Sequence, residues 1–572
     1  MESVKTTMKH YYHTEAESVR FKDITSSAEN RAVLHRIKNN DPSFDMLIID
    51  DTDLFFGEEN VFIVGEGDDL EWLGYFIGEN KTLTHISFCY VPACKDQLER
   101  LFNGIKRNSS IKSAYISLHD DRPSDYFSAI NLPQVTDIEF FESDTDKAPY
   151  IAIALQRCES LKEYTGPVTS EIAESLAMLP MLEEVKTQRD RTLGISRDEC
   201  LGMRRLLAIA NNMKVLNIRS AGLGIDGLEL LAEGLAYNAS LTDGVMDLSR
   251  NAIGDLGLQA LASSLARNSK LRTLHLTDNN IGDAGLEALA DSLSNNGSLR
   301  ELSLSGNVSI TEIGVAAISG VLTTHTSCLE DLRLEGIGIG GLRALAHALG
   351  QNKSLKSLSV GNIGDESACA LANALGRNTS LKSLNFDWER ITSIGWIAFF
   401  KSLCDTSSPH SIHLSNHALI KLGYLHANEI FQRSWLTELS LENLILLCLG
   451  ANQSPHLAAK FKILAFFPHI DLTPLFKWRL KALPFVMGWF AEVAELEASF
   501  ETRKLSAVYQ FVRGMSCLVV DECKDRVGQV ESDEMGQVPT ATDLDNIRKT
   551  WARVVLALTT VVAATLWVWY LI

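Results

Sequence analysis

Hydrophobic and polar positions recur with one period through residues 243–385 of this chain. Each copy of the pattern begins with a leucine, and successive copies begin 26 to 30 residues apart, at Leu271, Leu299, Leu329, Leu355 and Leu381. A period of this length is typical of repeats that each form one coil of a solenoid. The repeat alone therefore predicts that this part of the chain folds as a solenoid.

Within one copy the pattern predicts a short strand followed by a helix. Leu274 and Leu276 flank the polar His275, which is the alternation of a strand with one buried face. Apolar residues at positions 286, 289, 290 and 293 form the stripe of an amphipathic helix. Neither element can bury its apolar face alone. We therefore expect an α/β solenoid, with parallel strands on its concave side and helices on its convex side.

Two turns connect the strand and the helix, and polar residues mark the first of them. We expect the side chain of Asn279 to bond the backbone of its own turn, because a buried turn has lost water as a partner. Gly282 and Asp283 are expected to provide the bend and the N-cap of the helix that follows.

The consensus LxxLxLxxNxIGDxGLxALAxxLxxNxS, strong in about five consecutive copies, resembles the ribonuclease-inhibitor-type leucine-rich repeat. The resemblance implies a horseshoe-shaped solenoid. In the family this repeat also builds the sensor end of NOD-like receptors and the body of the Ran GTPase-activating protein, and all of these are recognition surfaces. Because one fold hosts many functions, the resemblance leaves the partner open.

Six segments follow from these patterns. They are a polar lead-in (1–43), irregular repeats (44–212), regular repeats (213–443), a helical C-terminal cap (444–520), an acidic flexible linker (521–547) and a basic flank with a transmembrane helix (548–572). Irregular strands are expected to start at Phe44, Leu83, Ile111, Val135, Leu161 and Leu182, and the regular block at Met213. Two further strands, at 412–414 and 436–441, bring the expected total to about fourteen coils.

The apolar end of the chain predicts a membrane anchor. The nineteen uncharged residues 554–572 span roughly 28 Å as a helix, close to the ~30 Å hydrocarbon core of a bilayer. The positive-inside rule places the flanking Arg548, Lys549 and Arg553 in the cytosol. We expect a tail-anchored chain, in an organelle that the sequence does not name, whose repeats face the cytosol. The spanning residues include Val554, Leu558, Val562, Leu566, Trp567, Trp569 and Ile572.

Composition narrows the environment and the partner. The N-terminus has no secretory signal, and ten scattered cysteines without metal spacing indicate reduced, mostly buried thiols. A formal charge of −19 argues against nucleic acid as a partner and mildly favours a basic protein. Sequons such as Asn80, Asn108, Asn238, Asn296, Asn352 and Asn378 would suit a glycosylated ectodomain, but a repeat that ends in NxS generates them by its own pattern.

The concave face is where we expect a partner to bind. Its candidate residues include His275 and Arg333. The residue just after the first apolar residue of each copy adds a basic column on an acidic protein, made of Lys112, Lys162, Lys214, Arg272, Arg300, Lys356 and Lys382 and interrupted by the neighbouring Glu301, Glu330, Asp331, Glu335 and Asp387. Such a column would meet acidic groups of a partner, although solvated lysines and arginines would give the same pattern. The spacing of His410, His413 and His417 is a weaker indication of a metal site, because no carboxylate or thiolate completes it.

The sequence thus favours a recognition module or scaffold that is not an enzyme, uses no cofactor and is held at a membrane by its C-terminus. No nucleophile elbow, HExxH or other catalytic signature occurs in it. Two alternatives remain open at this point. One is a regulator that activates a small GTPase, by analogy with the Ran activator, and the other is a lumenal or extracellular binding ectodomain. The oligomeric state is also open.

Overall fold

The computed structural model describes residues 19–50, 60–65, 69–89, 91, 93–117, 123–141, 145–187, 194–238, 241, 244–324, 327–336, 341–426 and 441–466. The chain divides into two units, Met1–Gly341 and Leu342–Ile572. In each unit strands alternate with helices along the chain.

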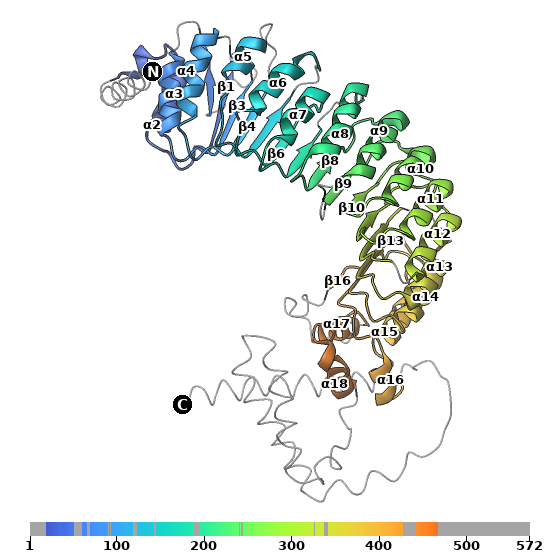
Figure 1. Cartoon of the computed structure of the whole chain (residues 1–572). Helices are drawn as coiled ribbons and strands as arrows, with labels where there is room; N and C mark the ends of the chain where they lie inside the picture. Colours follow the sequence, from blue (N-terminus) through green and yellow to red (C-terminus); the bar gives the residue numbers. More distant parts are fainter. Residues whose placement is uncertain are drawn as a thin grey trace, which may run out of the picture. The chain divides into compact units, whose positions relative to one another are not determined.

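A parallel sheet runs through the first unit in the order β2-β1-β3, followed by β4 to β12 in sequence. Its strands are β1 (Met46–Asp50), β2 (Val61–Ile63), β3 (His85–Phe88), β4 (Ser113–Ile116), β5 (Asp137–Phe140), β6 (Glu163–Thr165), β7 (Glu184–Lys186), β8 (Val215–Asn217), β9 (Gly244–Asp247), β10 (Leu271–His275), β11 (Glu301–Ser303) and β12 (Asp331–Leu334). Figure 1 shows the helices of this unit stacked along one side of the strands.

The helices of the first unit are α2 (Ala28–Lys38), α3 (Leu70–Glu79), α4 (Lys95–Ile105), α5 (Pro123–Ala129), α6 (Ala148–Leu155), α7 (Ser170–Ala177), α8 (Arg197–Ile209), α9 (Gly224–Tyr237), α10 (Gly254–Leu265), α11 (Asp283–Leu293) and α12 (Glu312–Thr323), with short 3-10 helices η1 (Phe21–Asp23) and η3 (Thr145–Lys147). Neighbouring helices pack closely. At Gly104 an added Cβ would lie only 2.2 Å from the backbone of Gly74, so α3 and α4 need glycine where they meet.

The second unit contains the strands β13 (Ser357–Asn362), β14 (Ser383–Asp387), β15 (Lys421–Leu422) and β16 (Leu425–His426). Its helices are α13 (Leu342–Gln351), α14 (Asp365–Leu375), α15 (Ser393–Leu403), α16 (Pro409–Leu414), α17 (Leu441–Ala451) and α18 (Pro455–Phe466). Strands β13, β14 and β15 pair in parallel, whereas β16 folds back antiparallel to β15.

The predicted division of each copy into strand and helix is confirmed. Leu274 and Leu276 are fully buried, as are the helical Leu286 and Leu289, and they form one continuous core between sheet and helices. The parallel sheet with alternating helices is the predicted solenoid architecture.

In the regular coils, buried asparagines that follow the strand join one coil to the coil before it. The Nδ2 of Asn279 donates to the carbonyl of Leu248 at 2.9 Å, and its Oδ1 accepts from the amide of Asn251 at 2.8 Å. Asn307 repeats both bonds one coil later, to Leu276 and Asn279, each at 2.9 Å. The predicted bond within the turn is made by Asn251 and Asn307, whose Nδ2 atoms also donate to the carbonyls of Leu248 and Leu304 at 2.9 and 2.7 Å, whereas the two bonds of Asn279 reach the preceding coil.

A second asparagine ladder lies at the turn that ends each helix. The Nδ2 of Asn296 donates to Leu265 of the preceding coil at 2.7 Å, and its Oδ1 accepts from the amide of Leu299 at 2.9 Å. The same two kinds of bond are made by Asn80, Asn108, Asn238, Asn268, Asn378 and Asn416. Most of the sequon asparagines therefore bond backbone in the protein interior.

The aspartates at the helix starts also act on a neighbouring coil. Oδ1 of Asp283 accepts from the amides of Thr311 and Gly314, at 2.8 and 2.9 Å, so it caps the next helix and not its own as predicted. The N-cap of its own helix is Gly282. In the second unit, the hydroxyl of Thr392 and then the amides of Thr392 and Gly395 lower the pKa of Asp365 in the same way.

One predicted strand was wrong. Residues 412–414 belong to α16, because Ser408 caps a helix there and Pro409 is pre-set for its first turn. In the other coils a strand follows the ladder asparagine, and the strand that follows the ladder residue Asn416 is β15. Of the other expected strand, 436–440 lie outside the described residues and Leu441 begins α17.

The sequence analysis missed how the first unit begins. Strand β2 pairs outside β1, so it forms the edge of the sheet. Asn30 of α2 bonds this edge through both of its amide atoms: Nδ2 donates to the carbonyl of Ile63 at 2.7 Å, and Oδ1 accepts from its amide at 2.9 Å. Part of the segment expected to be a polar lead-in thus covers a strand edge that would otherwise attract other chains.

We predict that Asn279→Ala destabilises the first unit by about 1–3 kcal/mol, because it leaves the buried amide of Asn251 without its acceptor and removes one of the two donors to the carbonyl of Leu248. Hydrogen exchange read by mass spectrometry should show faster exchange in β9 to β11. The exposed Asn295→Ala in the same coil serves as the control. Equal protection in the two variants would contradict the role given to the ladder.

Candidate partner-binding face

The parallel sheet of the first unit leaves one surface without helices, which we call the strand face and which corresponds to the predicted concave side. Along most strands from β4 to β12 buried residues alternate with half-exposed ones, as in β5, where Ile138 and Phe140 are buried and Asp137 and Glu139 are not. Because the strands are in register, equivalent half-exposed residues form columns across them. One column contains Thr273, Glu301 and Asp331, and the next contains His275, Ser303 and Arg333.

The predicted basic residues lie in such columns. Backbone bonds place Arg300 beside Arg272, Lys382 beside Lys356, and Lys214 beside Glu183, each at 2.7 Å from amide nitrogen to carbonyl oxygen. Acidic residues interrupt the column that contains Lys214 and Arg300. Glu183 pairs with Lys214 at 3.1 Å, and Glu330 pairs with Arg300 at 2.6 Å. The basic column is therefore interrupted and partly neutralised from within.

His275 and Arg333 meet a single carboxylate. Oε1 of Glu301 lies 3.4 Å from Nε2 of His275 and 2.7 Å from Nη2 of Arg333. Arg333 also contacts Asp331 at 3.3 Å. Burial opposes the charge of Arg333, but the hydrogen bond that its guanidinium donates to Asp331 and the charges of its carboxylate neighbours raise the pKa of the guanidinium. These residues form a charge-compensated surface and not a free basic patch.

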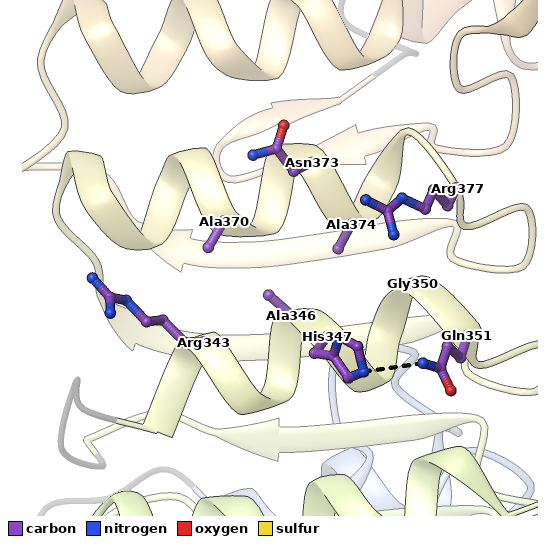
Figure 2. A pocket seen from close by; sticks show the side chains of 9 residues that line it. All are labelled: Arg343, Ala346, His347, Gly350, Gln351, Ala370, Asn373, Ala374 and Arg377. Atoms are coloured by element: carbon purple, nitrogen blue, oxygen red, sulfur yellow. Dashed lines mark hydrogen bonds between the residues drawn. The ribbon is translucent and has the colours of Figure 1, made fainter.

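A groove on the helix side of the second unit has a volume of about 220 Å³. Figure 2 shows small side chains, Ala346 of α13 and Ala370 and Ala374 of α14, between the two helices, with Arg343 and Arg377 at opposite ends. His347 faces Gln351, with 3.0 Å between the two Nε2 atoms, and Arg343 forms an ion pair with Glu366. The shallow groove offers cationic ends but brings no nucleophile and base together.

A larger depression, of about 540 Å³, lies at the first turns of α8 and α9. Its polar lining mixes Arg197 with Asp226, Glu229 and Glu233. Charges of both signs around one open depression do not select one ligand charge, so it is a weaker candidate than the strand face.

The predicted histidine group is split by the fold. His410 and His413 are exposed on α16, whereas His417 is half-buried. Nε2 of His417 donates to the carbonyl of His413 at 3.2 Å, and Nδ1 accepts from Nζ of Lys462 at 3.2 Å. Within the described residues, no cluster of three or more histidine, cysteine or acidic side chains could hold a metal ion.

Lys462 is the buried counterpart of His417. Its ammonium also donates to the carbonyls of Leu403 and Asn416, at 2.6 and 2.8 Å, so all three of its protons have partners. Burial and then the charge of Lys462 lower the pKa of His417 to about 4. The bonds of His417 and Lys462 therefore join α18 to the residues around α16, which is a structural role.

Predicted membrane residues 554–572 lie outside the described residues. Among the helices that the structure does describe, none is both long and apolar enough to cross a bilayer. The expected anchor therefore stays a prediction.

Sequence comparison matches residues 245–262, 267–290 and 295–319 to the Leucine Rich repeat family model. The chain contains leucine-rich repeats. The matched residues cover β9 to α12, where the ladders and caps of the repeat are most regular. No curated protein matches the chain significantly.

Two solved structures similar to this chain have the titles "Crystal structure of TLR13-ssRNA13 complex" and "Crystal structure of Rad7 and Elc1 complex in yeast". The first is 14% identical with a TM-score of 0.31, and the match covers 56% of this chain and 52% of that one. The second is 12% identical with a TM-score of 0.31, covering 68% and 92%. This chain thus spans about half the length of the first structure.

The sequence analysis did not find the acidic columns of β5 to β7. It followed the residue just after the first leucine of each copy and so did not compare the next exposed position. At that position Asp137, Glu163 and Glu184 follow one another in register. Aligning the irregular copies on their strand leucines or isoleucines would have revealed this from sequence alone.

We predict that the end of the second unit loses stability in acid. The unfolded chain protonates His417 near pH 6.5 but the folded chain only near pH 4, so stability is intact above about pH 6.5 and falls as the pH drops towards 4. Because solvent screens the partly exposed ring, the loss amounts to about 2 kcal/mol and not to the full value of the shift. In His417→Gln this loss should be absent. Hydrogen exchange of α16 to α18, compared between variants at each pH, measures it.

The exposed His413→Gln on the same helix should keep the acid sensitivity of the parent chain. If His417→Gln is as acid-sensitive as the parent, another group controls this end of the solenoid.

Proposed function

We propose that this protein is a non-catalytic recognition module whose strand face binds a protein partner. The observation that supports this most directly is the strand face itself: from β3 to β12 its half-exposed side chains stand in fixed columns, while the opposite side of the sheet is packed against helices. Ladder bonds hold those columns in place before any partner arrives. Binding therefore costs little reorganisation of the backbone.

The proposal predicts which side of the coils contacts the partner in cells. A photoreactive amino acid at Tyr115 or Thr273, both on the strand face, should crosslink to the same protein. The same group at the exposed helix positions Glu99 or Glu287 should not. Mass spectrometry of the crosslinked bands identifies the partner. Crosslinks that form only from the helix positions would reject the strand face as the recognition surface.

We further propose that the C-terminal segment 554–572 tethers the module to a membrane, with the repeats in the cytosol. The uncharged length of this segment and the basic residues before it support the tether. Tethering would raise the effective concentration of the module near partners on the same membrane.

The buried sequons support a cytosolic environment over a lumenal one. Asn378 is 2% exposed, and its Nδ2, the atom that would carry a glycan, donates to the carbonyls of Leu349 and Asn352. Asn108 is 1% exposed and bonds Ile77 and Asn80 in the same way. A glycan at either position would break the ladder, so a glycosylated ectodomain conflicts with this packing.

Membrane flotation should separate the full chain from a version that ends at Asn546. The full chain is expected to float with membranes and its repeats to be digested by added protease, whereas the shorter chain stays in the soluble fraction. If the repeats are protected from the protease and carry sugar on the sequons, they lie on the lumenal side of the membrane and the proposed topology is wrong. A shorter chain that still floats would place the membrane contact elsewhere.

A further inference from the structure

The strand face of β4 to β7 differs from the rest of the sheet in its charge. One column runs Ser113, Asp137, Glu163 and Glu184, in register on four consecutive strands. The adjacent column runs Tyr115, Glu139, Thr165 and Lys186 on the same strands. Within these two columns four carboxylates stand with one ammonium group, and the exposed Lys112 and Lys162 lie beside them, just before β4 and β6.

On this surface the carboxylates outnumber the cations that pair with them. Nζ of Lys186 lies 3.1 Å from Glu184 and 3.4 Å from Glu163, so one cation serves two carboxylates. Asp137 accepts a hydrogen bond from the hydroxyl of Ser113 at 2.9 Å, which is a neutral partner. On β10 to β12, by contrast, arginine and histidine face the carboxylates of Glu301 and Asp331. The excess of negative charge thus belongs to β5 to β7.

An exposed aromatic residue borders the acidic columns. Phe141 follows β5 directly and is 52% exposed, and its ring centroid lies 6.2 Å from that of Tyr115. Burial and then the charge of Glu139 raise the pKa of the Tyr115 hydroxyl, so the aromatic pair and the acidic columns adjoin each other. Phe141 thus adds an exposed aromatic surface beside the acids, and aromatic residues are enriched in protein–protein interfaces.

We propose that this acidic-aromatic patch, made of Tyr115, Asp137, Glu139, Phe141, Glu163 and Glu184, docks an extended basic segment of the partner protein. Lysine or arginine side chains of the segment meet the carboxylates, and one apolar side chain packs on Phe141. The inference rests on the proposed function and names the partner class for the same face. It replaces the expected basic column, in which Lys214 and Arg300 pair with Glu183 and Glu330, as the main electrostatic feature of the strand face.

Spacing and charge favour this occupant. Neighbouring strands lie about 4.8 Å apart, so Asp137, Glu163 and Glu184 form a row of about 10 Å that one extended segment can follow. The negative field of the patch repels nucleic acid and anionic lipid and attracts a basic segment. Lys186 competes with the segment for two of the carboxylates, which provides a distinctive test.

The test uses the full chain in detergent and a fluorescein-labelled twelve-residue peptide that alternates lysine and arginine around one central leucine. Fluorescence anisotropy should report binding that weakens as salt is raised from 50 to 300 mM. The double variant Glu139→Lys, Glu163→Lys should weaken binding tenfold or more. Phe141→Ser should weaken it severalfold, while Lys186→Met should strengthen it by removing the internal competitor.

The matched control is Glu99→Lys, Glu229→Lys, which makes the same charge change at exposed helix positions. Binding within twofold of the parent is expected for it. If the control weakens binding as much as the patch variant, or if a glutamate version of the peptide binds equally well, the patch is not a basic-segment site. Unchanged hydrogen exchange in β4 to β7 verifies that each variant is folded.

Failure here is distinct from failure of the recognition proposal. If the peptide does not bind but crosslinks from Thr273 on the strand face still form in cells, recognition stands and only the basic class of partner is wrong. If neither occurs, the strand face itself is not the binding surface.

Discussion

Each coil of this chain turns twice in the protein interior, where its amides and carbonyls have no water to bond. In the regular coils asparagine side chains bond the backbone of both turns, because the side-chain amide donates and accepts at once and can bridge two coils. Asn279 and Asn307 do this after the strand, and Asn296 after the helix. Each of these asparagines makes at least one bond to the preceding coil, so register and stacking follow from the same side chains that satisfy the turns.

The irregular coils satisfy the first of these turns differently. No asparagine follows the strands β3 to β7 in the sequence, although Asn80 and Asn108 keep the second ladder. After β6 the buried hydroxyl of Tyr164 donates to the carbonyl of Pro167 at 2.6 Å instead. The backbone requirement is met, but without a fixed turn sequence. The coils that carry the acidic-aromatic patch are therefore freer to vary where their strands end.

Sequence alone could predict the solenoid, the strands of the regular copies and the burial of their leucines, because a period of 26 to 30 residues leaves few alternatives. It could not predict where side-chain bonds end. Asp283 looks like a cap for its own helix, yet it caps the next one, since the stacking of coils brings the amides of Thr311 and Gly314 closer to its carboxylate. The error at residues 412–414 has a similar origin: the alternation of Ile412, His413 and Leu414 suggested a strand, but Ser408 and Pro409 start a helix.

The candidate surface shows the same limit in its charges. A column of lysines and arginines can be read from the sequence, but its net effect depends on which residues stand on neighbouring strands. Glu183 lies about 31 residues before Lys214 in the chain, and Glu330 lies 30 after Arg300, yet each is an ion-pair partner across one strand spacing. Pairs of this kind contribute little to stability when exposed. Their larger effect is to remove charge from one part of the strand face and so leave β5 to β7 as its most negative region, which is what a basic partner would detect first.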